Sequence, residues 1–319
     1  MNNDYKRGDV INDRLSSFLL SSGQIHARSI RFIKQHVYKL KTEHDQNYIL
    51  KRHTHEQQVK QQRDFFQQIK LPHIAKFAVY PNGKEWIYDT EGGLWTITPF
   101  IKGRSLNYAH HNDRVEASQL LSHFHNYARH IHVPQPVKRQ IFFMKWLHRL
   151  LSFKKTAHIF SEYGYNTLFH DIVQTTERHI QDLAIYPWEK LLSDAERNGL
   201  WIHGDVASHN FLKGDRTYLI DFDLLTQTCQ LYDAIQLGQR FLPYIDWDLE
   251  TLLSYDLAGN HKEMWLAAVI VPGDLLREWL HKLRKSDVSD IPELLSELDR
   301  VWTKRQKFLK EATNMIKSS

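Results

Sequence analysis

The segments "WIHGDVASHNFL" at residues 201–212 and "YLIDFDLL" at residues 218–225 combine apolar, strand-like runs with acidic and amide side chains. The first segment contains an aspartate followed five residues later by an asparagine, and the second ends its apolar run with two more aspartates. Hard cations such as Mg²⁺ prefer oxygen ligands, and two carboxylates suffice when phosphate oxygens complete the coordination shell. These segments therefore predict an oxygen-rich site for phosphoryl transfer.

Each side chain in the two segments has an expected role. Asn210, Asp221 and Asp223 are the candidate Mg²⁺ ligands, because amide and carboxylate oxygens suit this ion. Asp205 precedes them on its own loop, where it can accept a proton from an incoming hydroxyl group, and it is the candidate catalytic base. No basic residue lies between residues 220 and 230, so we expect the carboxylates to repel one another when no metal is bound.

The composition describes an ordinary globular chain of 319 residues, with 42% apolar and 25% charged residues. The net charge of +5 suits a phosphate-binding protein, but Lys and Arg form no single stripe and no nucleic-acid-reading motif is present. We therefore expect no nucleic-acid partner. The lone cysteine, Cys229, cannot form an internal disulfide. We also expect no transmembrane segment, no signal peptide and a cytoplasmic location.

Apolar patterning predicts two lobes. Residues 1–101 are expected to form the first lobe, a five-stranded antiparallel sheet with one helix over residues 54–70. Thr54 and Gln57 fit a capping box for that helix. Residues 102–319 are expected to form a helical lobe that carries the catalytic and metal-binding loops. The strand-like segments are "ARSIRFI", "HVYKLKT", "NYILKR", "HIAKFAVY", "EWIYD" and "LWTITPF". The clearest helical segments of the second lobe are 115–131, 142–151, 168–183 and 188–198.

The two opening segments resemble the core of the aminoglycoside phosphotransferase and choline kinase family. This branch of kinase-like proteins has His-Gly-Asp in its catalytic loop, an asparagine five residues after the aspartate, and Asp-aromatic-Asp or Asp-aromatic-Glu at the metal site. The chain matches this pattern in residue type, order and strand context. The resemblance implies an α+β, bilobal, protein kinase-like fold with a small β-rich N-terminal lobe and a large helical C-terminal lobe. It also implies an ATP- and Mg²⁺-dependent kinase that phosphorylates a hydroxyl group of a small molecule.

The resemblance also implies a phosphate-binding lysine in the first lobe. The stretch "VYKLKTEHDQNYILKRH" resembles the second and third strands of the kinase small lobe, which makes Lys51 the residue that grips the α- and β-phosphates. Arg52 and Lys39 are the alternatives. Glu56 is the candidate partner of Lys51, or else a residue that only stabilises the helix N-terminus.

Two further segments of the first lobe bear on nucleotide binding. "TITPFIKG" falls where kinases have the hinge between lobes, so the backbone of Pro99, Phe100 and Ile101 is expected to contact adenine. The turn in "FIKQHVYKL", which should cover the phosphates, contains no glycine. Glycine lets backbone N–H groups approach phosphates closely, so we expect weak ATP affinity, with Lys34 adding compensating charge.

A finer resemblance is to the CotS/YutH group of bacterial spore-coat-associated proteins, which are kinase-like proteins of the same branch. It rests on "HVYKLKT", "YILKR", "WIHGD", "YLIDFD", "LYDAIQLGQRFL" and "WDLETLLSYDL". The kinase-like resemblance covers residues 28–285, and in this branch Asp233 supports the catalytic loop. The finer resemblance implies spore coat proteins as partners and a location in the spore coat. It also implies an alternative function, a non-catalytic coat protein that keeps a kinase fold.

Overall fold

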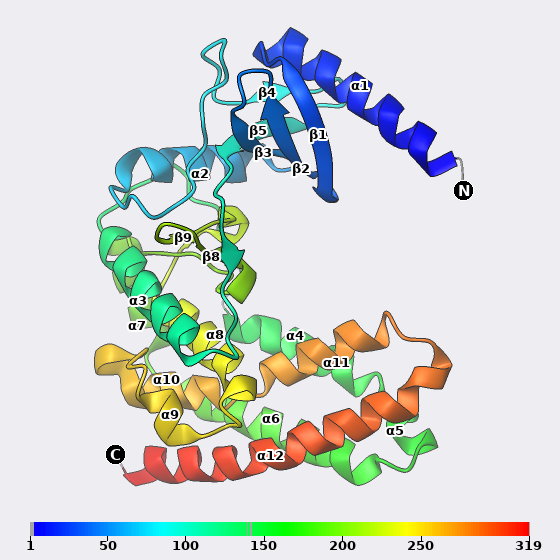
Figure 1. The fold of residues 1–319 in the computed structure, drawn as a ribbon. Coiled ribbons are helices and arrows are strands. Elements are labelled where there is room, and N and C mark those ends of the chain that lie inside the picture. Colours follow the sequence, from blue (N-terminus) through cyan, green and yellow to red (C-terminus); the bar gives the residue numbers. More distant parts are fainter. Residues whose placement is uncertain (1–2, 139, 141, 319) are drawn as a thin grey trace. The chain divides into compact units, whose positions relative to one another are not determined.

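The structure is a computed structural model, and it describes residues 3–138, 140 and 142–318. Figure 1 shows the chain, which divides into two compact units. The first unit comprises Met1–Ser105, Ile131–Val137 and Phe211–Asp223, and the second comprises Leu106–His130, Lys138–Asn210 and Leu224–Ser319. Each unit is thus assembled from three stretches of chain, whereas the sequence prediction placed one boundary between residues 101 and 102.

The first unit is built on a five-stranded sheet in the order β1–β2–β3–β5–β4, with antiparallel neighbours throughout. A three-stranded sheet in the order β6–β8–β9 belongs to the same unit. The elements are α1 (Asn3–Gly23), β1 (Ala27–Lys34), β2 (Val37–Thr42), β3 (Asn47–His53), α2 (Glu56–Gln68), β4 (Ile87–Tyr88), β5 (Leu94–Pro99), β6 (Arg104–Ser105), β8 (Phe211–Lys213) and β9 (Thr217–Leu219). Five of the six strand-like segments of the first lobe are therefore confirmed as strands.

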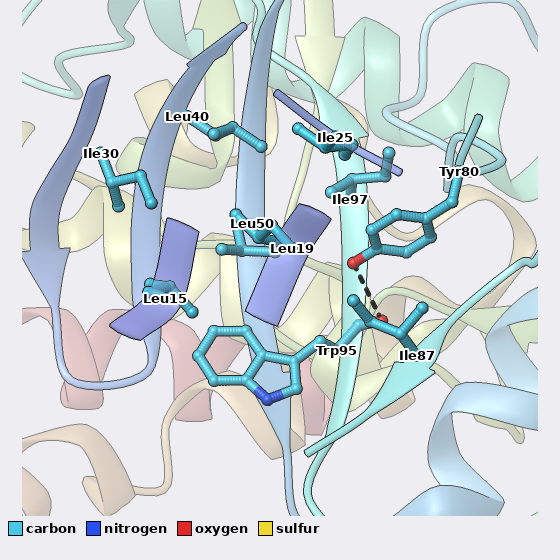
Figure 2. Packing of buried hydrophobic residues seen from close by; sticks show 10 residues of the cluster. All are labelled: Leu15, Leu19, Ile25, Ile30, Leu40, Leu50, Tyr80, Ile87, Trp95 and Ile97. Carbon is cyan, nitrogen blue, oxygen red and sulfur yellow. Dashed lines mark hydrogen bonds between the residues drawn. The ribbon is translucent and has the colours of Figure 1, made fainter. Parts of the chain in front are cut away.

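The core of the first unit lies between α1 and the five-stranded sheet (Figure 2). Leu15 and Leu19 are four residues apart on α1, so they share one helix face. They pack with Leu50 and Trp95 of the sheet, and the hydroxyl of Tyr80 donates to the Trp95 carbonyl oxygen at 3.3 Å. Full burial of a leucine side chain stabilises a fold by about 1.5–3 kcal/mol. No helix was predicted from the sequence over residues 3–23, where α1 forms.

The expected strand over residues 73–80 is wrong. This segment makes only two isolated bridges, a parallel one from Ile74 to Leu219 and an antiparallel one from Ala78 to Ile97. Its two bridging residues pair with two different sheets, so no continuous ladder forms with either one.

The expected capping box of α2 is also wrong. The helix begins at Glu56, with His55 as the N-cap residue in an extended conformation and no side-chain cap hydrogen bond. Thr54 therefore lies one residue before the N-cap, outside the position from which a hydroxyl can bond the first turn.

The second unit is mostly helical, with a small β7–β10 pair. Its helices are α3 (His111–Tyr127), α4 (Phe142–Lys154), α5 (Ala157–Glu162), α6 (Asn166–Asp182), α7 (Trp188–Arg197), α8 (Leu231–Phe241), α9 (Leu249–Leu253), α10 (Lys262–Val269), α11 (Gly273–Leu283) and α12 (Ile291–Ser318). The strands are β7 (Trp201–Ile202) and β10 (Thr226–Gln227). The four clearest helical segments of the sequence are thereby confirmed as α3, α4, α6 and α7, with shifted ends.

Helices α4 and α11 lie side by side in the second unit (Figure 1). A Cβ atom on Gly273 would lie 2.2 Å from Cδ1 of Trp146, so only glycine permits this close approach. The contact fixes how the side chains of α4 and α11 are presented to the rest of the unit. Among the residues that the structure describes, no helix combines the length and the apolarity that a membrane crossing requires.

Candidate active site

The candidate phosphate site of the first unit centres on Lys51, on the central strand β3. The strand pairs Lys51 with Val37 of β2 on one side and Thr96 of β5 on the other. The Lys51 ammonium donates to Oδ1 of Asp221 at 2.7 Å and to Oδ2 of Asp223 at 2.5 Å. The structure thus brings together three of the predicted site residues, although they are about 170 positions apart in sequence.

Opposite charges stabilise this cluster. Burial alone would lower the pKa of Lys51, but the carboxylates of Asp221 and Asp223 outweigh burial and raise it. Lys34, at the end of β1, adds a second ammonium 3.4 Å from Oδ2 of Asp221. Cations from strands far away in the sequence therefore offset the mutual repulsion that the sequence predicts for the two aspartates.

Two residues of this site have left-handed backbone conformations. Asp221 has φ of 62° and His36 has φ of 64°. Aspartate tolerates this region better than most residues, whereas glycine adopts it without steric cost. His36 belongs to the two-residue turn between the paired residues Lys34 and Val37. The glycine-free turn therefore holds one residue in a conformation that favours glycine.

Glu56 does not pair with Lys51 in this structure. Its exposed carboxylate accepts a hydrogen bond from the Tyr88 hydroxyl at 3.0 Å and forms an ion pair with Lys60 at 2.9 Å. The Lys60 pair is an (i, i+4) contact along α2, so Glu56 is engaged by its own helix and by β4. The aspartates at residues 221 and 223 take the position expected for Glu56.

The alternatives to Lys51 are engaged elsewhere. The Arg52 guanidinium binds Asp89 at 2.5 Å and Glu91 at 2.9 Å. The Lys39 ammonium lies 3.7 Å from the centre of the Phe100 ring. Successive residues of a strand point to opposite faces, which explains why neighbouring Lys51 and Arg52 have different partners.

The predicted hinge residues line a cavity in the first unit. Pro99, Phe100 and Ile101 share the wall of a cavity of about 630 Å³ with Ile74 and Tyr218. The Phe100 N–H donates to the Asn47 carbonyl oxygen at 2.9 Å, which ties the start of the hinge segment to β3. Most of the wall is apolar or aromatic, with Lys76, Lys102 and Asp215 adding charge, and such a cavity can hold a flat heterocycle.

The candidate catalytic loop of the second unit is held by Asp233, on α8. The fully buried carboxylate of Asp233 accepts hydrogen bonds from the backbone N–H groups of His203 at 2.7 Å and Gly204 at 2.9 Å. His125 of α3 lies 3.1 Å from the same carboxylate. The hydroxyl of Tyr108 donates to the Val206 carbonyl oxygen at 2.8 Å. These contacts fix the backbone on both sides of Asp205.

The glycine of the His-Gly-Asp sequence is required by geometry. Gly204 has φ of 83°, and a Cβ atom there would lie 2.3 Å from the Leu224 carbonyl oxygen. Farther along the loop, the Asn210 amide nitrogen donates to the Asp205 carbonyl oxygen at 2.9 Å. That bond orients the Asn210 side chain and leaves its oxygen atom as the potential metal ligand.

The Asp205 carboxylate has an arginine partner that the sequence analysis missed. Nη2 of Arg240 donates to Oδ1 of Asp205 at 2.8 Å. Arg240 lies on α8, seven residues after Asp233, so two helical turns place both residues on one face. That spacing within "LYDAIQLGQRFL" is the signal from which Arg240 could have been found.

Asp205 and Arg240 line a cavity of about 300 Å³ within the second unit. A second cavity of about 260 Å³ shares wall residues with it, among them Phe142, Tyr232 and Gln236. Small-molecule sites in proteins usually have volumes of about 300–1,000 Å³, so this space suits a small acceptor. Its position at the candidate base makes it the candidate acceptor site.

Asp221 and Asp223, the predicted metal ligands that belong to the first unit, fit a cation. Asp221 and Asp223 already bind one ammonium group, that of Lys51, and two carboxylates with phosphate oxygens can hold Mg²⁺. No group of three or more His, Cys, Asp or Glu side chains positioned for a metal occurs among residues 3–138, 140 and 142–318. Any metal here would therefore depend on oxygen atoms supplied by the nucleotide.

Comparisons with known proteins agree with this fold. The model of the phosphotransferase enzyme family (APH) matches residues 31–269. An aminoglycoside phosphotransferase from Alicyclobacillus acidocaldarius subsp. acidocaldarius DSM 446 is 15% identical, with a TM-score of 0.69 over 94% of this chain and 96% of that one. Spectinomycin phosphotransferase APH(9)-Ia, solved with AMP, is 16% identical, with a TM-score of 0.63 over 90% and 94%.

The amicoumacin kinase hAmiN, solved with AMP-PNP, Ca²⁺ and Ami, is 15% identical, with a TM-score of 0.61 over 98% of this chain and 96% of that one. A search of curated protein sequences finds no match. The structural similarities confirm the predicted kinase-like fold, with a small antiparallel sheet unit and a mostly helical remainder. The family model matches well over half of the length of this chain, so the chain belongs to the phosphotransferase enzyme family.

Proposed function

We propose that the protein transfers the γ-phosphoryl group of ATP to a hydroxyl group of a small molecule in a Mg²⁺-dependent reaction. The observation that carries the proposal is the cluster of Lys51 with Asp221 and Asp223, whose charges suit a nucleotide phosphate chain. Asp205, on a loop braced by Asp233 and facing a small cavity, adds a group that can act as a base.

The chain's own residues divide the work of the transfer. Lys51 and Lys34 bind phosphate oxygens and offset their charge. Asp205 accepts the proton of the acceptor hydroxyl while the hydroxyl oxygen forms a bond to the γ-phosphorus. The bond between that phosphorus and the bridging oxygen breaks, and its electron pair leaves with ADP. Arg240 orients the Asp205 carboxylate through its 2.8 Å contact.

Asp221, Asp223 and Asn210 are the residues that we propose as Mg²⁺ ligands. When bound, the ion neutralises charge on the transferring phosphoryl group. The complexes of APH(9)-Ia with AMP and of hAmiN with AMP-PNP and Ca²⁺ support nucleotide and divalent-metal use in this fold. For this chain, Pro99, Phe100 and Ile101 are proposed to contact the adenine base from the wall of their cavity.

A second proposal is a non-catalytic protein of the spore coat, bound to other coat proteins. It rests on the sequence resemblance to CotS/YutH proteins. The observations that favour it are the ion pairs of Asp221 with Lys51 and Lys34, together with the glycine-free turn. Both features allow a stable fold that never binds ATP.

Thermal unfolding with and without ATP and Mg²⁺ separates the two proposals. A nucleotide site stabilises the wild-type fold by about 2.7 kcal/mol at a ligand concentration one hundred times Kd. Lys51→Met should abolish the shift, whereas the matched control Lys41→Met should keep it, because Lys41 pairs with exposed Asp45. If the wild type shows no shift at millimolar ATP, the enzyme proposal fails and the coat proposal stands.

Turnover provides the second part of the test. Asp205→Asn keeps the shape of the side chain but removes the proton acceptor, so ATP-dependent stabilisation should persist. Phosphotransfer should fall by about 10²–10⁴-fold, the usual contribution of a general base. Unchanged turnover in Asp205→Asn would show that another residue serves as the base.

A further inference from the structure

The cavity beside Asp205 has an excess of positive charge. Its wall carries four cationic and two anionic side chains, a net charge of +2: Lys145, Arg149, Arg240 and Arg277, with Asp205 and Asp274. These residues come from α4, α8, α11 and the catalytic loop, all within the second unit. A cavity of about 300 Å³ with four cationic side chains in its wall attracts anions, because the low-dielectric walls focus the positive potential inside it.

The two carboxylates of the cavity already have arginine partners. Asp205 accepts from Arg240 at 2.8 Å. Asp274 accepts from Nη1 of Arg305 at 2.9 Å and from Nη2 at 2.5 Å. Arg305 lies on α12 with its side chain 2% exposed, and it does not line the cavity. The negative charge of Asp274 is therefore largely neutralised from behind the wall.

Arg149 and Arg277 have weaker partners than Arg240 and Arg305, each of which binds an aspartate. Nη1 of Arg149 donates to the Gly273 carbonyl oxygen at 3.2 Å, a neutral acceptor. Nη2 of Arg277 lies 2.8 Å from the carboxylate of its sequence neighbour Glu278, and both side chains are more than a third exposed. Exposed ion pairs of this kind contribute little. Both guanidinium groups therefore retain the capacity to bind a further anion.

Mutual repulsion among the arginines also favours the binding of an anion in this cavity. Burial, and after it the charge of Arg277, lowers the pKa of Arg149. Burial and then Arg277 likewise lower the pKa of Arg240. Like charges that lower one another's pKa are stabilised when an anion binds among them.

We propose that the acceptor is a hydroxyl compound that also carries an anionic group, a phosphate or a carboxylate. The anionic group binds Arg149 and Arg277, and the hydroxyl group lies at Asp205. Planar guanidinium groups bind such anions with paired hydrogen bonds, which gives the acceptor a fixed orientation. This proposal rests on the proposed phosphotransferase function, because it assigns the acceptor class of the same site.

The remaining walls define the rest of the acceptor. Phe142, Trp146 and Tyr232 provide aromatic surface, and the adjoining cavity of about 260 Å³ gives room beyond them. Aromatic faces suit the carbon skeleton of a polyol or sugar. A polycationic acceptor would instead be repelled by the four cationic side chains of the wall. Sugar or polyol phosphates and hydroxy acids fit both the charge and the size of the cavity.

Matched pairs of acceptors test the proposal directly. ADP release with ATP and Mg²⁺ is measured for glucose 6-phosphate against glucose, for glycerol 3-phosphate and glycerate against glycerol, and for the polycation kanamycin. Thermal unfolding with each compound alone, and with inorganic phosphate, reports binding without turnover. We expect the anionic member of at least one pair to bind at least tenfold more tightly, and we expect kanamycin not to bind.

Variants locate the anion site. Arg149→Gln and Arg277→Gln should raise KM for the anionic acceptor by about tenfold to hundredfold, the loss of one charge-assisted contact, while kcat and KM for ATP change little. Arg284→Gln, an exposed arginine at the end of α11, is the control and should change neither value. Unfolding curves of the variants without acceptor show whether each one is folded.

The outcomes separate this inference from the proposed function. If an anionic probe stabilises the wild type but not Arg277→Gln, and no ADP forms, the anion site stands and the transfer function fails. If glucose, glycerol or kanamycin is phosphorylated as well as the anionic compounds, the transfer function stands and the inference is overturned. If no anionic probe binds at millimolar concentration, the inference is also overturned.

Discussion

The candidate sites of the two units differ in how their charges are balanced. In the first unit, the ammonium groups of Lys34 and Lys51 face Asp221 and Asp223, so two cations meet two carboxylates. In the second unit, the cavity at Asp205 gathers four cations against two carboxylates. In a balanced site the protein's own side chains offset one another's charge. An unbalanced site reveals the charge of its ligand.

Buried polar atoms show the same contrast. Among the residues that the structure describes, every buried side-chain nitrogen or oxygen without a hydrogen-bond partner lies in the second unit, including both ring nitrogens of His179 and the indole nitrogens of Trp247 and Trp265. In the first unit, the ring of the largely buried His53 bonds the Thr96 hydroxyl at 2.8 Å. A buried polar group without a partner lowers the stability of the fold. Replacing such a group with an apolar one should therefore stabilise the second unit more than the first.

The largest effect that we expect in the fold concerns these two histidines in acid. Burial, and after it the nearby charge of Lys51 for His53 and of Arg178 for His179, lowers each pKa to about 4. An unfolded chain has a histidine pKa of about 6.5, so between pH 6.5 and 4 it binds more protons than the folded chain. Stability should fall as the pH drops through this window, by up to about 3 kcal/mol for each histidine.

Leucine substitutions sharpen the comparison between the units. His179→Leu should remove its share of the acid sensitivity with little loss at pH 7.5, because the ring makes no hydrogen bond of normal length and the Asp182 carboxylate lies 3.6 Å from its Nδ1 atom. His53→Leu should also remove acid sensitivity but lower stability at pH 7.5 by about 1 kcal/mol, because it leaves the Thr96 hydroxyl unpartnered. Urea unfolding at pH 7.5 and 4.5 measures both effects. If the two variants have the same free energy of unfolding at pH 7.5, the two histidines do not differ in their hydrogen bonding.

A smaller effect should follow when the charge balance of the first unit is broken. Lys51→Met leaves Asp221 and Asp223 without their main cation, and we expect a loss of about 1–2 kcal/mol, moderated by the partial exposure of Asp223. Adding Asp223→Asn to Lys51→Met should recover part of the loss, because one repelling charge is removed. Chemical denaturation of the two single variants and the double variant gives the coupling. Strict additivity would mean that Lys51 and Asp223 do not interact.

The sequence predicted the parts of the site that depend on local pattern. Strand alternation placed Lys51 on β3, and the spacing of Asp205, Asn210 and Asp221 followed directly from two short segments. For Glu56 the sequence left two alternatives open, and the structure agrees with the second, because Glu56 lies in the first turn of α2 with Lys60 and Tyr88 as its partners.

The cations of the acceptor cavity could not be predicted in the same way. Arg149, Arg240 and Arg277 lie on α4, α8 and α11, and only helix packing brings them to one cavity. No pattern within any single helix signals that convergence, apart from the seven-residue spacing of Asp233 and Arg240. The close contact of Gly273 with Trp146, on which the packing of α4 and α11 depends, is likewise invisible to periodicity.

The smallest expected effect concerns the turn between β1 and β2, where the first unit departs most from the pattern of its family. His36 has φ of 64°, a conformation that costs a non-glycine residue about 1 kcal/mol, whereas Gln35 is not among the residues with positive φ. His36→Gly should therefore stabilise the fold by about 0.5–1 kcal/mol, and Gln35→Gly should destabilise it slightly through chain entropy.

Under the proposed function, removing the His36 side chain also lets backbone N–H groups approach the phosphates, so AMP-PNP should bind up to about tenfold more tightly. Urea unfolding and calorimetry of both glycine variants measure the two effects. If the two variants have the same stability and the same affinity, the backbone of this turn does not limit nucleotide binding.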